Sequence, residues 1–458
     1  MNAIILLALV GVFSMFCGLF RLRTLALPVI LLSLIASLVI YQYNMHGDFS
    51  NLLNNMVRFD SFSDSFSIVI VFSSIFLFIM SRYYYSEKIE HLTDIYALIT
   101  FSVAGGILLV SFQNLVMLFL GVEILSIPLY ILAASNRRSL ESNEAGLKYF
   151  LTGAFFTSIM LLGITMIYGA YGSFDTDQIT SLIQSQGASP LFVLGAVLIL
   201  CAMFFKLSAV PFHYWAPDVY QGAPTVLTAY VSTVVKIAAM GALLKFAMFI
   251  THYESNIWVN LFTFVAIITM VYGNVVSIVQ HNFKRLLAYS GIANVGFVMI
   301  AVIILNDNSV PYILYNLLAY AVAAILAFSI YSTVKTHTGV DTIDELAGLL
   351  TNNKLLSAGF LVALLSFAGI PPLSGFFGKY FIIAHAVVAE YFWLAIIAVI
   401  LSVLGAYNYL RISAAIVKSN DSIPAIQLSM PYKLYIIGSI IVILALGIFP
   451  DQVLDILR

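Results

Sequence analysis

Long apolar runs recur along almost the whole chain, and they limit its possible folds more than any other feature. Each run holds about 20 residues, the length that an α-helix needs to cross the hydrocarbon core of a bilayer. Hydrophobic residues make up 62% of the sequence and charged residues only 9%, whereas soluble domains carry about 25% charged residues. Because backbone groups in lipid must be hydrogen-bonded internally, the pattern predicts an all-α polytopic membrane protein.

The apolar runs give the number and the limits of the expected membrane spans. We predict about fourteen transmembrane helices from them. Their expected ranges are 3–20, 24–42, 62–81, 93–111, 113–134, 147–169, 191–211, 224–250, 257–279, 285–305, 311–333, 355–383, 391–417 and 432–449.

The basic residues provide a test of this number, because lysine and arginine gather in cytoplasmic connections. Most of the 20 basic residues fall in every second connection, namely Arg21, Arg23, Arg82, Lys88, Arg137, Arg138, Lys148, Lys284, Arg285, Lys335, Lys354, Arg411, Lys418 and Lys433. Only Arg58 and Arg458 fall on the opposite side. The alternation predicts that both termini lie outside the cytoplasm. The net charge of −1 argues against a nucleic-acid partner and leaves the lipid bilayer as the expected surroundings.

Three lysines, Lys206, Lys236 and Lys379, lie deep inside predicted spans. An ionisable group inside the membrane costs about 3 kcal/mol on insertion scales, so each is a candidate functional residue. Glu123 is the acid nearest the middle of a span, and a nearby ammonium would favour its charged form. A carboxylate paired only for structure is the alternative. For a fourth lysine, Lys245, the simplest interpretation is a side chain that reaches the membrane interface.

Proline interrupts the seventh and the twelfth of the predicted spans. Pro211 follows Lys206 by five residues, and the pair Pro371 and Pro372 precedes Lys379. A broken helix is tolerated in lipid only where protein or a water-filled cavity satisfies the freed carbonyls. Interruptions at corresponding places in two halves of a chain indicate a transport site near the middle of the membrane.

The spans also divide into two similar blocks of five, from 93 to 250 and from 257 to 417. An odd number of helices places the second block in the opposite orientation, which is the pattern of an inverted repeat. We therefore predict four parts: a three-helix scaffold (1–90), a first five-helix repeat (91–250), an inverted five-helix repeat (251–420) and a C-terminal helix (421–458).

Other polar residues are candidate supporting groups. His213, just after the first break, titrates near neutral pH and is a candidate proton relay, with a structural role as the alternative. Asn294 and Tyr407 add polar groups within two later spans. Glu144 and Lys148 have the i,i+4 spacing of an exposed ion pair on the cytoplasmic side. The two cysteines have neither redox nor zinc-binding spacing, so no metal site is predicted.

Several longer strings are typical of one family, namely FKLSAVPFHYWAPDVYQGAPT, GVEILSIPLY, EAGLKYF, FKRLLAYSGIANVG and GIPPLSGFFGKYF. Through them the chain resembles the antiporter-like membrane subunits of proton-pumping NADH–quinone oxidoreductase, respiratory complex I. The resemblance covers residues 90–420. The string VYQGAP and Lys379 resemble the N branch of this family more than its L and M branches.

The resemblance implies a role for each deep ionisable residue. Glu123 and Lys206 correspond to a coupled acid–base pair in a first half-channel, Lys236 to the central lysine, and Lys379 to the terminal lysine of a second half-channel. It also implies the bacterial inner membrane, periplasmic termini, and M-like and K-like neighbouring subunits. Flavin, iron–sulfur clusters and the quinone site are expected on other subunits, so no cofactor is expected in this chain.

Two other functions stay open on the sequence. A subunit of a multisubunit Na⁺/H⁺ antiporter would share the fold and the buried lysines, although VYQGAP argues against it. A non-pumping scaffold is of a different class, and it would have no need for Glu123, Lys206, Lys236 and Lys379 inside its spans. A substrate transporter is disfavoured because no further polar cluster appears in the spans.

Overall fold

The computed structural model describes residues 3–45, 53–85, 91–251, 255–419 and 423–457, so the predicted cytoplasmic Lys88 and the terminal Arg458 lie outside it. The helices within these ranges are α1 (Ala3–Leu19), α2 (Arg23–Gln42), α4 (Ser61–Tyr84), α5 (Leu92–Val110), α6 (Leu115–Ala133), α7 (Leu140–Tyr171), α8 (Thr176–Gln186), α9 (Pro190–Leu207), α10 (Trp215–Gly222), α11 (Thr225–Ser232), α12 (Val234–Thr251), α13 (Ser255–Ile278), α14 (Phe283–Ile304), α15 (Ser309–Thr338), α16 (Leu349–Asn352), α17 (Lys354–Ala368), α18 (Ser374–Val388), α19 (Phe392–Val417), α20 (Met430–Ile448) and α21 (Pro450–Leu457).

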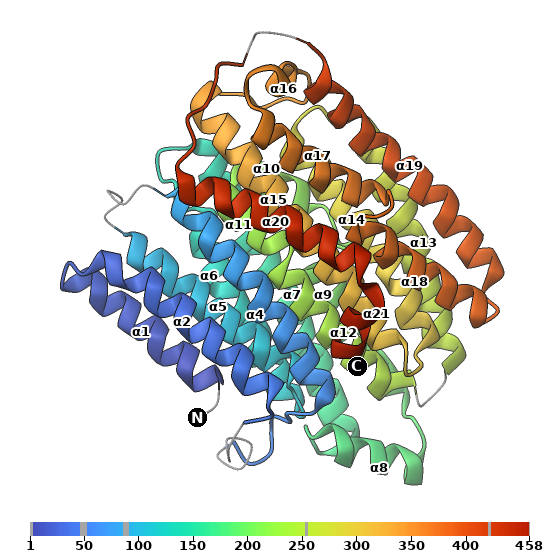
Figure 1. Cartoon of the computed structure of the whole chain (residues 1–458). Helices are drawn as coiled ribbons and strands as arrows, with labels where there is room; N and C mark the ends of the chain where they lie inside the picture. Colours follow the sequence, from blue (N-terminus) through green and yellow to red (C-terminus); the bar gives the residue numbers. More distant parts are fainter. Residues whose placement is uncertain (1–2, 46–52, 86–90, 252–254, 420–422, 458) are drawn as a thin grey trace.

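The membrane-spanning helices agree with the predicted fold class. Within the described ranges, 12 helices are long and apolar enough to cross a membrane, with α11 and α12 taken together as one. The shorter α1 and the broken pair α17–α18 account for the remaining predicted spans. In Figure 1, α1 and α2 lie along one side of the bundle and α13 and α19 along the other. The all-α polytopic fold is therefore confirmed.

Glycines allow the backbones of neighbouring helices to touch. A Cβ atom added at Gly105 of α5 would lie only 2.5 Å from the backbone nitrogen of Leu125 on α6. Added Cβ atoms at Gly121 of α6, Gly273 of α13 and Gly296 of α14 would also lie within 3.0 Å of the facing backbone. In lipid, where apolar surface gains little by pairing, such close van der Waals contact holds helices together. The pairs α5–α6 and α13–α14 share this packing.

The first predicted break lies at the end of α9. The helix stops at Leu207, and Ser208 turns the chain with a left-handed φ of +62°. The indole nitrogen of Trp215 donates to the carbonyl of Phe205 at 3.0 Å, so the loop itself satisfies a carbonyl freed by the break. The backbone nitrogen of Val210 donates to the Thr269 hydroxyl at 3.0 Å. The interruption predicted at Pro211 is therefore confirmed, with the helix ending slightly before the proline.

The second break separates α17 from α18 at the predicted proline pair. Gly369 follows α17 with φ of +82°, a conformation that favours glycine. The Ser366 hydroxyl accepts from the backbone nitrogen of Gly375 at 3.1 Å, across the turn. Pro371 and Pro372 form the turn itself, and α18 begins two residues later. This break is confirmed.

A third break was not predicted. The expected single span 224–250 consists of two helices, α11 and α12, separated at Thr233 with φ of −121° and ψ of −85°. The hydroxyls of Ser232 and Thr233 donate to the carbonyl of Ala229 at 2.9 and 2.7 Å. Both side chains satisfy this one carbonyl, because the backbone nitrogen of Thr233 bonds to Tyr230 instead. The chain is therefore interrupted without proline or glycine. The predicted span 224–250 is present, but this interruption within it was not predicted.

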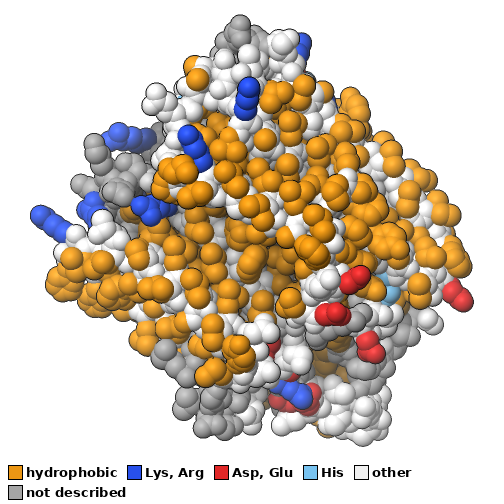
Figure 2. All heavy atoms as spheres, viewed as in Figure 1, with side chains coloured by type: hydrophobic (Ala, Val, Ile, Leu, Met, Phe, Trp, Pro, Cys, Tyr) orange, Lys and Arg blue, Asp and Glu red, His pale blue; other side chains and the backbone are white. Residues whose placement is uncertain are grey.

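The connections between helices gather on two faces of the bundle. Asp218 bonds to both Lys148 and Arg285, which joins three of the predicted cytoplasmic connections. At the other end, Arg58 lies 3.7 Å from Asp177 and joins two predicted outer connections. Figure 2 shows a wide hydrophobic band, with most visible basic side chains above it and most visible acidic ones below it. We call the end that carries Lys148, Asp218 and Arg285 the basic face and the other end the opposite face.

Candidate functional site

Lys206 lies on α9 and is 5% exposed. Its ammonium donates to the hydroxyl of Ser126 on α6. It also lies 5.8 Å from the ring centroid of Tyr130 and 5.6 Å from that of Tyr149. Tyr149 stacks on Trp215, with ring centroids 4.6 Å apart, so the loop after the break positions the rings around the lysine. A hydroxyl and two aromatic faces hold this ammonium.

Glu123 precedes Ser126 by three residues, so both lie on the same side of α6. Within the described residues no ion pair joins Glu123 to Lys206, whose ammonium contacts Ser126 instead. The Lys206 ammonium therefore reaches α6, the helix that also carries Glu123, through the Ser126 hydroxyl. Charges inside a low-dielectric bundle are screened weakly, so an interaction between Glu123 and Lys206 would depend strongly on the distance between them.

Lys236 lies on α12, three residues after the break at Thr233, and is 4% exposed. Its ammonium donates to the carbonyl of Gly291 on α14 at 2.9 Å. A Cβ atom added at Gly291 would lie 3.0 Å from this ammonium and 3.0 Å from the hydroxyl of Tyr320 on α15. The absence of a side chain at Gly291 therefore lets the lysine and the tyrosine hydroxyl approach the same point.

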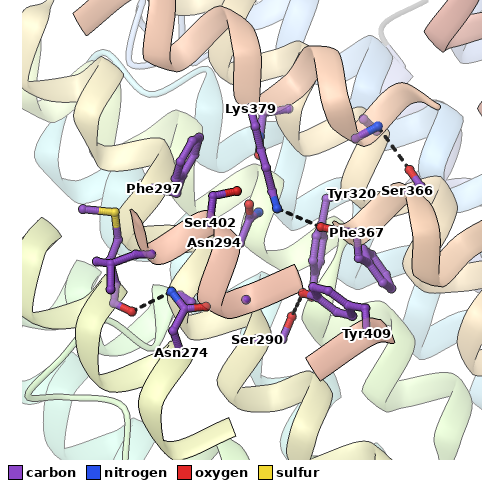
Figure 3. A pocket seen from close by; sticks show the side chains of 17 residues that line it. Asn274, Ser290, Asn294, Phe297, Tyr320, Ser366, Phe367, Lys379, Ser402 and Tyr409 are labelled. Carbon is purple, nitrogen blue, oxygen red and sulfur yellow. Dashed lines mark hydrogen bonds between the residues drawn. The ribbon is translucent and has the colours of Figure 1, made fainter. Parts of the chain in front are cut away.

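Lys379 points into a polar cavity between α13, α14, α15, α17, α18 and α19 (Figure 3). Its ammonium donates to the carbonyl of Phe367, at the broken end of α17, at 2.9 Å. The polar side chains that line the cavity with it are Asn274, Ser290, Asn294, Asn316, Tyr320, Ser366, Ser402 and Tyr409. Tyr320 borders both this cavity and Lys236, so the two lysines share a neighbour.

Of the predicted supporting residues Asn294 on α14 and Tyr407 on α19, only Asn294 lines the Lys379 cavity. Asn294 lines the cavity, as Figure 3 shows. Tyr407 is 54% exposed on the outside of α19 and does not line the cavity. Tyr409 lines it instead and hydrogen-bonds to Ser290. Residues two apart on a helix differ in direction by about 200°, so Tyr409 faces the cavity and Tyr407 faces outward, and a supporting role for Tyr407 stays a prediction.

A family model described as NADH:quinone oxidoreductase/Mrp antiporter, TM, matches residues 112–405, which is more than half of the chain. The chain belongs to this family. It is 38% identical to NADH-quinone oxidoreductase subunit N of Flavobacterium psychrophilum, with 100% of both chains covered. It is 39% identical to subunit N of Cytophaga hutchinsonii, with 100% of this chain and 99% of the relative covered.

Solved structures show the same fold. A chain of respiratory complex I from Thermus thermophilus with bound aureothin is 29% identical, with a TM-score of 0.79 over 99% of this chain and 98% of that chain. A chain of the Mrp complex from Dietzia is 18% identical, with a TM-score of 0.86 over 99% of this chain and 95% of that chain. Because the Mrp chain is only 18% identical, its similarity shows the fold alone.

In this member of the oxidoreductase/antiporter family, His213 lies in the turn after α9. Its ring packs edge-on against Tyr272, with centroids 4.4 Å apart. Burial lowers the pKa of His213, and a hydrogen bond with the backbone of Pro211 opposes that effect only in part. His213 does not line the Lys379 cavity. Its role as a relay stays a prediction.

One buried lysine was missed. Lys284 is 4% exposed, and its ammonium donates to the carbonyl of Ala223, in the turn between α10 and α11, at 2.7 Å. Because it adjoins Arg285 at the start of a span, the sequence indicates only a cytoplasmic surface charge. The contact instead fastens the loop of the first block to α14 of the second block.

The predicted ion pair on the basic face is part of a larger network. Glu144 and Lys148 are joined at 2.6 Å, and Lys148 also lies 2.7 Å from Asp218. Asp218 in turn bonds to Arg285 at 2.7 Å. Burial alone would raise the pKa of Asp218, but hydrogen bonds from Lys148 and Arg285 outweigh it and hold the pKa below its usual value. One carboxylate on α10 thus ties α7 to α14.

Replacing Asp218 by asparagine should therefore destabilise the protein, by about 1 kcal/mol once solvent screening of these partly exposed groups is included. Because folding lowers the pKa of Asp218, the carboxylate stabilises the protein fully above its unfolded pKa of about 4 and loses this effect as the pH falls through the folded pKa. The thermal stability of the detergent-solubilised variant should be reduced equally at pH 6 and pH 8. A loss of thermal stability that is present at one of these pH values and absent at the other would contradict a carboxylate that is charged at both.

Proposed function

We propose that this chain translocates protons in the membrane arm of an NADH–quinone oxidoreductase, along Glu123, Lys206, Lys236 and Lys379. The relatives that match the whole chain are subunits N of this enzyme. The observation that carries the site is a series of three ammonium groups beside helix breaks, each held by a hydroxyl or a carbonyl. Lys206 and Lys236 are buried, and Lys379 is half-buried and lines the cavity. Such groups are retained in a membrane mainly where charge moves.

The proposed step begins with a change in the distance between Glu123 and Lys206. At an effective dielectric constant of about 20, two opposite charges 4 Å apart attract by about 4 kcal/mol, and by about 2 kcal/mol at twice that distance. Moving the carboxylate away destabilises the ammonium of Lys206, which then gives up a proton toward Lys236. Moving it back favours uptake of the next proton from the basic face. The chain supplies the charges, and the coupling motion comes from quinone reduction elsewhere in the enzyme.

Buried tyrosine hydroxyls lie beside the proposed route. In the described part of the chain, the hydroxyls of Tyr149, Tyr220 and Tyr320 have no protein hydrogen-bond partner. Tyr149 contacts Lys206 through its ring, and Tyr320 adjoins Lys236. Tyr220 lies within electrostatic range of both tyrosines. Hydroxyls of this kind can bond to water, and a chain of waters can carry protons between lysines that are not in direct contact.

We also propose that 91–250 and 251–420 are inverted repeats, between the scaffold 1–90 and the C-terminal helix 421–458. The helices of the two blocks pack in a matching order. In the first block α5 packs on α6, α7 on α9 and α5 on α12; in the second, α13 packs on α14, α15 on α17 and α13 on α19. The lysines differ, since Lys206 precedes its break and Lys379 follows its own. In the proposed repeats, one lysine thus lies before the break of its block and the other lies after the break of its block.

The proposal includes the surroundings of the chain. We place it in the bacterial inner membrane, with both termini on the periplasmic side and the basic face toward the cytoplasm. M-like and K-like membrane subunits are the proposed neighbours, and flavin, iron–sulfur clusters and the quinone site lie on other subunits. A Na⁺/H⁺ antiporter subunit is the second candidate, because the family model covers both groups. The names of the full-length relatives favour the oxidoreductase.

Lys379 gives the most direct test of the proposal. In the assembled complex, Lys379→Met should lower the number of protons moved per NADH oxidised, because proton transfer through this subunit should fall by about 100-fold. Lys379→Arg should fail in the same way, since arginine keeps the charge but does not release its proton. Proton uptake and NADH oxidation are measured together in inverted membrane vesicles. Normal pumping by both variants would refute the proposed role of Lys379.

A further inference from the structure

A buried histidine lies on the same helix as Lys379, nearer the opposite face. His385 is six residues after Lys379 on α18 and is 4% exposed. Its Nε2 donates to the side-chain oxygen of Asn306 at 2.8 Å. Its Nδ1 is buried and has no hydrogen-bond partner in the described part of the chain. Nε2 therefore faces the Asn306 oxygen, and Nδ1 lies inside the bundle without a hydrogen bond.

Asn306 connects this histidine to the surface. It is exposed, in the connection between α14 and α15. It also lines a surface hollow together with Asp60, Asp307 and Lys245. The ammonium of Lys245 lies 5.5 Å from the ring centroid of Phe112 and has no hydrogen-bond partner among the described residues. A single hydrogen bond thus separates the buried imidazole from a polar opening on the opposite face.

On its inner side, the histidine is connected with the Lys379 cavity along one face of α15. Asn316 lines that cavity and packs against Gly378, whose added Cβ would lie 3.2 Å from the Asn316 amide nitrogen. Tyr312 is four residues before Asn316, so it lies on the same face of α15. The ring of Tyr312 packs edge-on against His385, with centroids 5.3 Å apart. Asn316 and Tyr312 therefore extend along α15 from the cavity to the ring of His385, with Phe381 stacked on Tyr312.

We infer that His385 passes protons between the Lys379 cavity and the hollow on the opposite face. This inference rests on the proposed function and adds the group at which protons leave the chain. An incoming proton forms an N–H bond at Nδ1 and gives an imidazolium. The Nε2–H bond then breaks and its proton passes to water beside Asn306 in the hollow, which leaves a neutral ring protonated at Nδ1. Reorientation of the ring resets it for the next proton. Asn306 accepts from Nε2–H and orients the ring. Histidine suits this step because its charge changes near neutral pH.

The groups that face this path set its electrostatics. Lys379 lies on the inner side, and Asp60, Asp307 and Lys245 lie in the hollow. Tyr312 and Asn306, which touch the ring directly, are neutral. Two carboxylates in the hollow favour the arrival of a proton there, since they stabilise a nearby positive charge.

The test uses His385→Gln and His385→Ala in the assembled complex. Glutamine can keep the hydrogen bond to Asn306 but cannot carry a proton, so pumping should fall by about tenfold in both variants. Imidazole added on the side of the hollow should restore pumping in His385→Ala and not in His385→Gln, where the amide fills the site. The matched control is His337→Gln, because His337 is an exposed histidine at the other end of α15, on the basic face.

The outcomes separate this inference from the proposed function. Normal pumping in His385→Gln together with lost pumping in Lys379→Met would overturn the role of His385 and leave the lysine pathway intact. Normal pumping in both variants would overturn both proposals. A loss in His385→Ala that glutamine repairs and imidazole does not would show a purely structural histidine and would also overturn the inference.

Discussion

Replacing Lys236 by methionine should stop proton transfer through this subunit while the complex still assembles. Lys236 is 4% exposed, and its ammonium has one protein partner in the described structure, the carbonyl of Gly291. Methionine has a similar length and removes the cost of burying a charge, so the fold should keep or gain stability. Transfer between the two halves should fall by about 100-fold, because no side chain that can carry a positive charge remains at the junction.

The geometry at Gly291 provides an independent way to disturb the same point. In Gly291→Ala, the new methyl group would lie 3.0 Å from both the Lys236 ammonium and the Tyr320 hydroxyl. The two groups must move apart, so proton pumping should decrease although every titratable residue is kept. Gly438→Ala is the matched control, because an added Cβ at this glycine of α20 meets nothing within 4 Å.

Both variants are measured by proton uptake and NADH oxidation in membrane vesicles, with the amount of assembled complex determined from the same preparation. Unchanged pumping in Lys236→Met would contradict a route through the centre of the chain. Equal effects of Gly291→Ala and Gly438→Ala would show a general response to added methyl groups rather than a role of this site.

The second large effect is expected at the pair Glu123 and Lys206. Lys206→Ala removes the ammonium, and Glu123→Gln removes the opposing charge with little change in shape. Each should lower pumping by roughly 100-fold if the two charges act as one switch. In that case the double variant should be no worse than either single variant, because residues that act as a unit are strongly non-additive.

The same cycle distinguishes a switch from two separate contributions. Independent roles would make the two losses multiply in the double variant. Ser126→Ala adds a further comparison, since the Ser126 hydroxyl holds the Lys206 ammonium on α6. Ser126→Ala should lower proton pumping less than Lys206→Ala or Glu123→Gln does. Full pumping in both Lys206→Ala and Glu123→Gln would refute the assignment of this pair.

Much of the architecture could be predicted from the sequence because the bilayer allows few solutions. Only a helix satisfies its own backbone in lipid, so each apolar run of sufficient length becomes a span. Pro211 and the pair Pro371 and Pro372 mark two breaks because proline cannot complete the helical hydrogen-bond pattern. The deep lysines were visible for the same reason, since a charge in an apolar run is conspicuous.

The contacts of those lysines were decided only by the tertiary structure. Ser126 reaches Lys206 from a helix 80 positions earlier in the chain, and Gly291 reaches Lys236 from 55 positions later. Local sequence does not specify such partners, because they depend on how the helices rotate and pack. The same limit explains the choice of Tyr409 over Tyr407, since both fit the local pattern and only one faces the cavity.

The break at Thr233 and the role inferred for His385 also became visible only in the tertiary structure. The hydroxyls that satisfy Ala229 resemble ordinary helix residues in the sequence. His385 stands near a predicted span end, and nothing around it in the sequence indicates Asn306, which lies 79 positions away. The sequence alone thus determined the spans, the two proline breaks and the buried charges, through the demands of lipid on the backbone. Only the packed structure decided which groups meet those charges, because these contacts join helices that are distant along the chain.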